Sequence, residues 1–200
     1  AALFAAPSLA QDARPTFGGF AEAVAMGRFA QSDAATAELT TPIVAAVGVG
    51  QLTVQLEATT IAEIASALGG TIVEASDGAV WICYGASDDR TLWFHSDDET
   101  GDGRVSLVAL EAVAPQPSWS CHDAPSLEAI DLGVPAIGTS TIAVTGRHGA
   151  PLPDEEGRFG FTSLSPHPSQ SNVTIRQDIV FRTSNGVINA TAVRQETGGE

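Results

Sequence analysis

The spacing of apolar residues predicts a helix at the start of the stretch 59–113, around which the chain is organised. Thr59 and Thr60 are favoured N-cap residues, and Glu63 lies three positions after Thr60, which is the spacing of a capping box. Gly69-Gly70 ends the helix, because glycine adopts the left-handed conformation without a Cβ clash. One side of this helix carries an apolar stripe, formed by Ile61, Ile64, Ala65 and Leu68.

Four antiparallel strands are predicted to follow this helix, at residues 71–75, 79–86, 91–96 and 104–113. Asp77-Gly78 between the first two is typical of a type I′ hairpin turn. Side chains alternate along a strand, so the more aliphatic face should contact the helix. We expect that face to carry Val80, Ile82, Tyr84, Leu92 and Phe94. The opposite face then carries Trp81, Cys83 and Trp93.

The stretch 139–194 repeats the order of a helix followed by strands. At a shift of 80 residues, the matches are Leu52 with Leu132, Thr60 with Ser140, Ile64 with Val144 and Gly69 with Gly149. At a shift of 83, they are Asp102-Gly103 with Asn185-Gly186, Val105 with Ile188 and Leu110 with Val193. A chance match is the alternative to a true repeat. We predict an α+β protein of two tandem modules, each a short helix packed on an antiparallel β-meander sheet.

The rest of the chain divides by composition. Residues 11–47 form an N-terminal helical or flexible segment, in which a weak pattern at 20–31 predicts a loosely packed helix. Residues 48–113 are the first module, 114–126 are a proline-rich linker and 127–196 are the second module. Proline removes backbone donors and restricts the preceding residue, so neither a helix nor a sheet should run through the linker.

The first ten residues predict export. They are small and apolar and end in Ser8-Leu9-Ala10, a pattern typical of signal-peptide cleavage, so we interpret 1–10 as a partial signal peptide. A hydrophobic N-terminal helix is the alternative reading. The segment is too short to span a bilayer, and no Cys follows the expected cut, so we expect no lipid anchor. A bacterial periplasmic or secreted location follows from this interpretation.

Charge narrows the choice of partners. The formal net charge is −15, and all nine basic residues other than histidine are arginines. This disfavours nucleic acid and anionic membranes as partners, since both require basic patches. The absence of lysine also removes Schiff-base chemistry and a phosphate-loop lysine. No later apolar run is long enough for membrane insertion. We expect no cofactor.

The two cysteines, Cys83 and Cys121, predict a disulfide, because an even number in an exported protein favours pairing. Closing a loop of this length stabilises the fold by about 4 kcal/mol on the chain-entropy model. The bond would tie the first sheet to the linker. The alternative is a nucleophilic Cys121 beside His122 and Asp123. Three consecutive residues are poorly placed for a nucleophile, its base and an orienting group, so we favour the disulfide.

The helix that closes on glycine and the meander with a glycine turn before its last strand resemble two related families. The resemblance rests on Thr60-x-x-Glu63, Leu68-Gly69, Ser140, Val144 and Gly149-Ala150-Pro151. One family is that of the β-lactamase inhibitor proteins, with two such modules in tandem. The other is the small lipoprotein of the outer-membrane β-barrel assembly machinery, with one. The chain departs from both: it has no lipidated Cys, and its expected disulfide straddles the linker. The resemblance implies an enzyme inhibitor or an envelope-assembly accessory.

Candidate metal chemistry is confined to one acidic stretch. Asp98 and Asp102 partly match a calcium loop, but Ala109 stands where the closing bidentate Glu belongs. A hairpin turn of solvated carboxylates explains the stretch equally well, so we do not favour calcium. The histidines lack metal-ligand spacing and are expected on the surface or in loops; they are His95, His122, His148 and His167.

Aromatic residues provide the main indication of function. Trp81, Tyr84, Trp93 and Trp119 gather around the first module, and tryptophan and tyrosine are enriched at protein interfaces. Core packing is the alternative. We predict a non-enzymatic module that binds another protein, and we expect Trp93→Ala to weaken partner capture without unfolding the chain. The alternatives are a purely structural envelope protein and a hydrolase that uses Asp97, Asp98 and Asp102 with His95.

Overall fold

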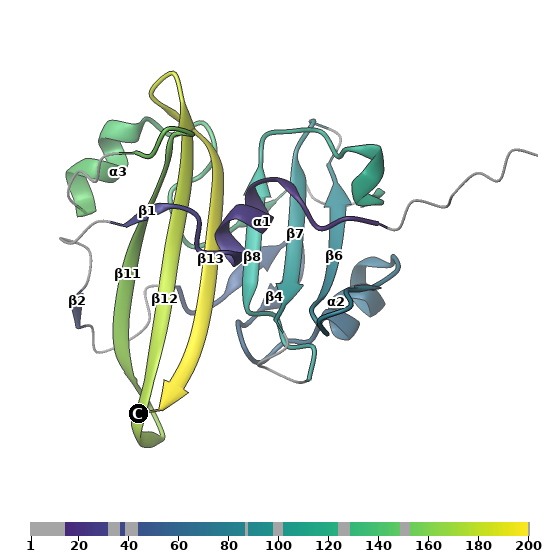
Figure 1. Cartoon of the computed structure of the whole chain (residues 1–200), viewed down its shortest axis with the longest axis horizontal. Coiled ribbons are helices and arrows are strands. Elements are labelled where there is room, and N and C mark those ends of the chain that lie inside the picture. The colour runs from purple at the N-terminus through teal and green to yellow at the C-terminus, as the bar shows by residue number, and fades with distance from the viewer. Residues whose placement is uncertain are drawn as a thin grey trace, which may run out of the picture.

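The computed structural model contains one large twisted sheet, with helices on both of its faces (Figure 1). It describes residues 15–31, 37–38, 44–86, 88–97, 102–123, 129–148 and 153–199. The main sheet has ten strands, and all pairings among its long strands are antiparallel. A second sheet has three strands. The predicted α+β class is therefore confirmed.

The helices are α1 (Gly19–Ala25), α2 (Ile61–Leu68) and α3 (Thr141–His148), and a 3₁₀ turn covers Pro117–Trp119. The long strands are β6 (Val80–Gly85), β7 (Thr91–Ser96), β8 (Leu107–Glu111), β11 (Arg158–His167), β12 (Gln170–Ser184) and β13 (Val187–Gly199). Short strands along the main sheet are β1 (Ala30–Gln31), β2 (Ala37–Glu38), β5 (Val73–Glu74) and β9 (His122–Asp123). The small sheet contains β10 (Ile130–Asp131), β3 (Val47–Val49) and β4 (Leu52–Val54).

Helix α2 begins and ends where its sequence predicts. The Thr60 hydroxyl accepts a hydrogen bond from the Glu63 N–H, and the Glu63 carboxylate accepts from the Thr60 N–H, which completes the capping box. Gly69 follows the helix with a φ of 79°. The turn after β5 differs from the prediction: only Gly78 has positive φ, and the Gly78 N–H donates to Ala75 O. A type I turn followed by a left-handed glycine, not type I′, therefore joins β5 to β6.

The strands of both halves join in one continuous sheet, because β8 pairs with β13 over five residue pairs. In each half, two backbone hydrogen bonds join the start of the helix to residues just before or at the start of the last strand. In the first half, Ile61 N–H donates to Gly103 O and Val105 N–H donates to Thr59 O. In the second half, the corresponding bonds are Thr141 N–H to Gly186 O and Ile188 N–H to Thr139 O. Three long strands follow α3, whereas β5 gives the first half a fourth strand.

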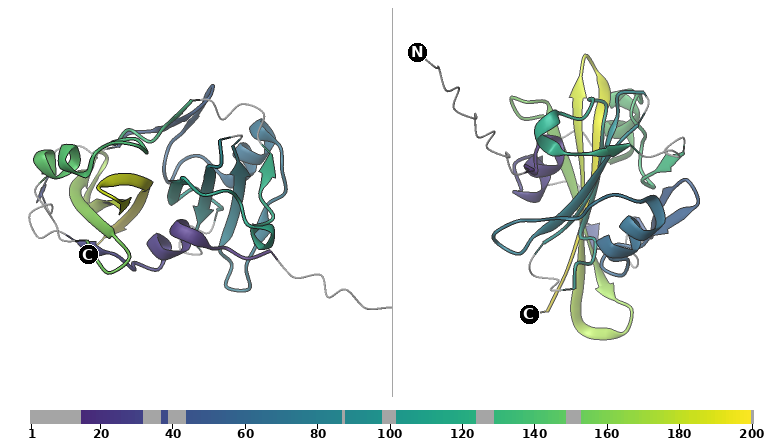
Figure 2. Two further views of the ribbon diagram at one scale, coloured as in Figure 1. Left: turned by 90° about the horizontal axis from the view of Figure 1, so that it is seen from above. Right: turned by 90° about the vertical axis from the view of Figure 1, so that its right-hand side faces the viewer.

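The two faces of the β6–β8 region bury different side chains. Ile82, Tyr84, Leu92 and Phe94 lie in one core with Ile61 and Ile64 of α2, as the alternation predicts. Trp81, Cys83 and Trp93 lie in a second core on the opposite face. Figure 2 shows α1 and α2 on opposite sides of the sheet. We call the α1 side the outer face.

Candidate functional site

The aromatic residues predicted to bind a partner are buried. Trp93 and Tyr84 are 0% exposed, and Trp81 and Trp119 are 5% exposed. Phe17, which precedes α1, packs its ring against Trp81 and Trp93 at centroid distances of 5.6 and 5.4 Å. The assignment of side chains to the two faces was right, but the prediction of an exposed aromatic face was wrong, because the N-terminal segment covers Trp81 and Trp93. Tyr84 lies in the other core, with α2. These four residues belong to the core.

Helix α1 is packed tightly, contrary to the loose helix that the sequence predicts. A Cβ atom at Gly18 would lie 2.6 Å from Trp119 Nε1, so only glycine permits this approach. Beneath the helix, the buried Glu111 carboxylate accepts hydrogen bonds from Phe20 N–H (3.3 Å) and Trp93 Nε1 (3.1 Å). Burial raises the pKa of Glu111, while Arg182 at 3.6 Å acts in the opposite direction.

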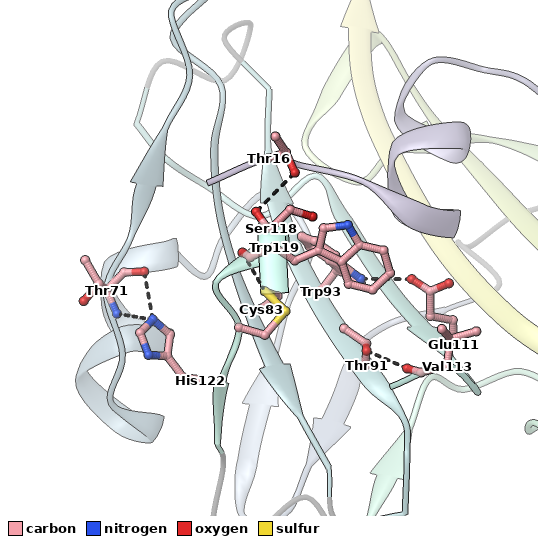
Figure 3. The surroundings of a disulfide bond; sticks show 11 residues. Thr16, Thr71, Cys83, Thr91, Trp93, Glu111, Val113, Ser118, Trp119 and His122 are labelled. Atoms are coloured by element: carbon pink, nitrogen blue, oxygen red, sulfur yellow. Dashed lines mark hydrogen bonds between the residues drawn. A yellow bond between two sulfur atoms is a disulfide. The ribbon is translucent and has the colours of Figure 1, made fainter. Parts of the chain in front are cut away.

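Cys83 and Cys121 form the predicted disulfide, across a sequence separation of 38 residues (Figure 3). The bond fastens the linker to β6. His122, which follows Cys121, is fixed by a hydrogen bond from Thr71 N–H to its Nε2 (2.8 Å). Because Cys121 is joined to Cys83, it is not a thiol nucleophile in this structure.

Of the four residues of the hydrolase alternative, the structure describes His95, Asp97 and Asp102. His95 is 7% exposed and its ring stacks on Phe17 at 4.6 Å, which corrects the expectation of a surface histidine. Its burial lowers its pKa to about 4, against a smaller opposite effect of the nearby Asp97 charge. Asp102 forms a surface ion pair with Arg104 (3.1 Å). Asp98 lies outside the described residues.

The structure describes one of the two candidate calcium ligands, Asp102, and the side chains of three of the four histidines. Across the described ranges, no three His, Cys, Asp or Glu side chains are grouped closely enough to hold a metal ion. Asp98, one of the two candidate ligands, is not among those residues. His167 lies at the end of β11, where its Nδ1 accepts from Ser169 N–H (3.3 Å). The side chain of His148 also lies outside the described part of the structure.

A hollow of about 460 Å³ lies beside the C-terminal end of β13, and we call it the edge pocket. It lies where β13 continues past Leu107, the first residue of β8, together with β11 and β12 (Figure 1). Its walls come from both halves of the chain. The first half supplies the turn before α2, the residue after β7 and the loop before β8, and the second half supplies the β11–β12 hairpin and β13. The lining residues are Leu56, Glu57, Ala58, Asp97, Arg104, His167, Gln170, Ile175, Gln195, Glu196 and Thr197.

Glu57 closes one side of the edge pocket. Its backbone has a φ of 57°, a left-handed conformation that non-glycine residues adopt at a cost. Its carboxylate accepts hydrogen bonds from Thr197 N–H (2.7 Å), the Thr197 hydroxyl and Gln195 Nε2 (2.8 Å). This carboxylate therefore occupies the edge of β13 at the point where β8 no longer covers it.

A buried amide holds Gln195 in its donating orientation. Gln177 is 0% exposed, and its Nε2 donates both to Gln195 Oε1 (2.8 Å) and to Val44 O (2.7 Å). Gln177 Oε1 in turn accepts from Val44 N–H (3.0 Å). The Gln195 amide must therefore present its NH₂ group to Glu57. The wall of the pocket is set by residues far apart in the sequence.

The edge pocket combines an apolar floor with a charged rim. Leu56 and Ile175 are each 7% exposed and supply the floor. Glu196 is ion-paired with Arg194, and Arg104 Nη1 donates to Glu57 O (3.4 Å). Such a site can hold a molecule that has both an aliphatic part and a charge.

Of the residues that line this pocket, only Asp97 and His167 were considered from the sequence as candidates for chemistry, and neither was predicted to act here. No local sequence signal marks Glu57, because a left-handed backbone is usually indicated by glycine or asparagine and this position holds neither. Gln195 and Thr197 carry the ordinary alternation of a strand.

No family model, curated protein or solved structure matches this chain significantly. Within the described parts of the chain, no helix has the length and apolar character that a membrane span requires.

Proposed function

We propose that this chain is an exported, non-enzymatic protein-binding module and that its partner docks at the edge pocket. The single observation that carries the proposal is the pocket itself. Its volume of about 460 Å³ lies in the range of ligand sites, and its rim holds charged side chains from both halves of the chain. The aromatic faces that would otherwise serve as an interface are covered.

The state of Glu57 favours binding over catalysis. A general acid or base must exchange a proton with a substrate and therefore needs a free lone pair aimed at it. The Glu57 carboxylate is instead engaged by Gln195 and by two donors of Thr197. His95, the histidine of the hydrolase reading, lies under Phe17 and does not line the pocket.

The proposal includes the two halves as structural copies, supported by the matching bonds at the starts of α2 and α3. At the sequence shift of 80, Glu57 corresponds to Ile137. Ile137 lines a smaller hollow of about 80 Å³, next to Leu110 of β8 and Thr191 of β13. The edge pocket is thus the place where one half departs from the other. The charged turn of the first half and the long strands of the second half meet at this pocket, which favours a function there over a role in folding alone.

A compartment outside the cytoplasm is consistent with the disulfide, because such bonds persist in oxidising environments. The bacterial periplasm, and a role as an enzyme inhibitor or an envelope-assembly accessory, are parts of the proposal. Part of the pocket wall is strand β13 and the β11–β12 hairpin, which suits either role, since a rigid wall loses little conformational entropy on binding.

The test is site-specific photo-crosslinking in the producing cell. A photoreactive amino acid at Gln170, an exposed pocket residue, should give adducts with another protein. The same group at Glu155, which is exposed but does not line the pocket, is the matched control and should give none. Adducts of equal yield at both positions, or at neither, would refute docking at the edge pocket.

A further inference from the structure

We infer that the edge pocket receives a basic side chain of the partner, an arginine or a lysine, with its stem on the apolar floor and its charge at the rim. This inference rests on the proposed function and names the chemistry of what is bound. It follows from the shape of the pocket, from the balance of charge at its rim and from a guanidinium that the chain itself places there.

The floor suits an aliphatic stem. Leu56 and Ile175 present apolar surface at the base of the pocket, and Ala58 is a further apolar residue of its lining. Arginine and lysine bury their methylene stems on such surface while their charged ends stay near water. A short polar side chain would leave the floor wet, and a purely apolar one would remove rim carboxylates from water without compensation.

The rim carries an excess of negative charge. The carboxylates at the pocket or ion-paired to its residues are Glu57, Asp97, Asp102 and Glu196. The guanidinium groups in the same network are Arg104 and Arg194. Among the described residues, four acids against two arginines leave two negative charges. A cationic group is therefore attracted to the rim and an anionic one is repelled.

Arg104 shows that a guanidinium fits at this rim. Its Nη1 donates to Glu57 O and its Nη2 contacts Asp102, so a carbonyl and a carboxylate already serve a guanidinium there. The side chain of Arg104 is 48% exposed and lines the pocket. Asp97 and Glu196 line the same pocket and add negative charge there.

The test uses three capped tripeptides of the form Gly-X-Gly, with X as arginine, norleucine or glutamate, added to the isotope-labelled full chain. Backbone amide shifts report binding, and we expect the arginine peptide to move the resonances of Glu57, Glu196 and Thr197. A single side chain should bind in the millimolar range. The norleucine peptide, which has the stem without the charge, should bind at least fivefold more weakly. The glutamate peptide should leave these resonances unchanged. A lysine peptide then shows which cation is preferred.

Two variants and one control test the charge at the rim. Asp97→Asn and Glu196→Gln should each weaken the arginine peptide about fivefold, as is typical for one partly exposed ion pair. Glu155→Gln removes an exposed carboxylate away from the pocket and should change nothing. Equal binding of the norleucine and arginine peptides, or no effect of either rim variant, would overturn the inference.

Failure of this inference is separable from failure of the proposed function. Crosslinks at Gln170 without binding of the arginine or lysine peptide would mean that a partner of other chemistry docks there. Binding of the arginine peptide without any crosslink at Gln170 would keep the cation site and reject the docking of a partner protein.

Discussion

The outer face and the edge pocket differ in exposure: the first is covered by other segments of the chain, and the second is open. The outer face holds the three tryptophans, and it is sealed by Phe17, α1 and the linker. The edge pocket has little aromatic character, and it stays open beside strands that run past their neighbours. The chain therefore buries its main aromatic cluster and leaves open a hollow that charged side chains line.

The burial of the aromatic residues shows that a dense aromatic cluster in a sequence does not by itself mark an interface. Burying a tryptophan in a core gains more than leaving it on the surface, and short segments elsewhere in the chain can supply the cover. In this protein the cover is a helix of seven residues, too short to be stable alone, so it folds against the aromatic face. Variants in the two regions should consequently behave differently: those on the outer face should change stability, and those at the pocket should change binding.

The largest expected effect is at the centre of the outer face. Trp93→Ala would leave a cavity under Phe17 and remove a partner of Glu111, so the free energy of unfolding should fall by about 3–5 kcal/mol. Urea denaturation followed by circular dichroism measures it. Gln170→Ala, at the exposed rim of the pocket, should change stability by less than about 0.5 kcal/mol. A Trp93→Ala protein of wild-type stability would mean that the face is not closed.

The disulfide should contribute a similar amount. Replacing Cys83 and Cys121 together by alanine frees a loop of 38 residues, which on the chain-entropy model costs about 4 kcal/mol. Chemical denaturation of the double variant and of the wild type, compared under oxidising conditions, provides the number. The Gly-X-Gly peptides should bind the folded double variant as they bind the wild type, since the pocket lies away from the bond.

His95 should make the stability of the closed face depend on pH. Burial lowers its pKa to about 4 in the folded chain, below the unfolded value of 6.5, so the unfolded chain binds the proton more readily. Its contribution is complete above pH 6.5 and is lost as pH falls toward 4, by an amount on the order of 3 kcal/mol. His95→Gln removes this contribution, so the stability difference between variant and wild type should change across that window. A constant difference would contradict burial of the imidazole.

The smallest expected effect concerns the pocket wall. Glu57→Ala removes the acceptor for Thr197 and Gln195 at a partly exposed site, and should cost about 1 kcal/mol. Glu57→Gly loses the same bonds but relieves the left-handed backbone, so it should be the more stable of the two by about 1 kcal/mol. Thermal unfolding of both variants tests the order. The reverse order would mean that the backbone at residue 57 is not left-handed in solution.

The features that could be predicted from the sequence depend on residues close together in the chain or on the regular alternation of side chains along a strand. The capping box of Thr60 and Glu63 spans three residues, and the alternation along β6 and β7 assigns every side chain to a face. The pairing of Cys83 with Cys121 followed because no other pairing is possible with two cysteines.

Which segment covers the outer face, and where the edge pocket forms, depend on the tertiary structure. Phe20 meets Glu111 across 91 residues, Val44 meets Gln177 across 133, and Thr197 meets Glu57 across 140. No local pattern encodes these distances, because they depend on how β13 docks against β8 and how far it continues beyond it. Whether an aromatic residue is core or interface, and whether a glutamate closes a strand edge, is settled by segments that meet only after the chain has folded.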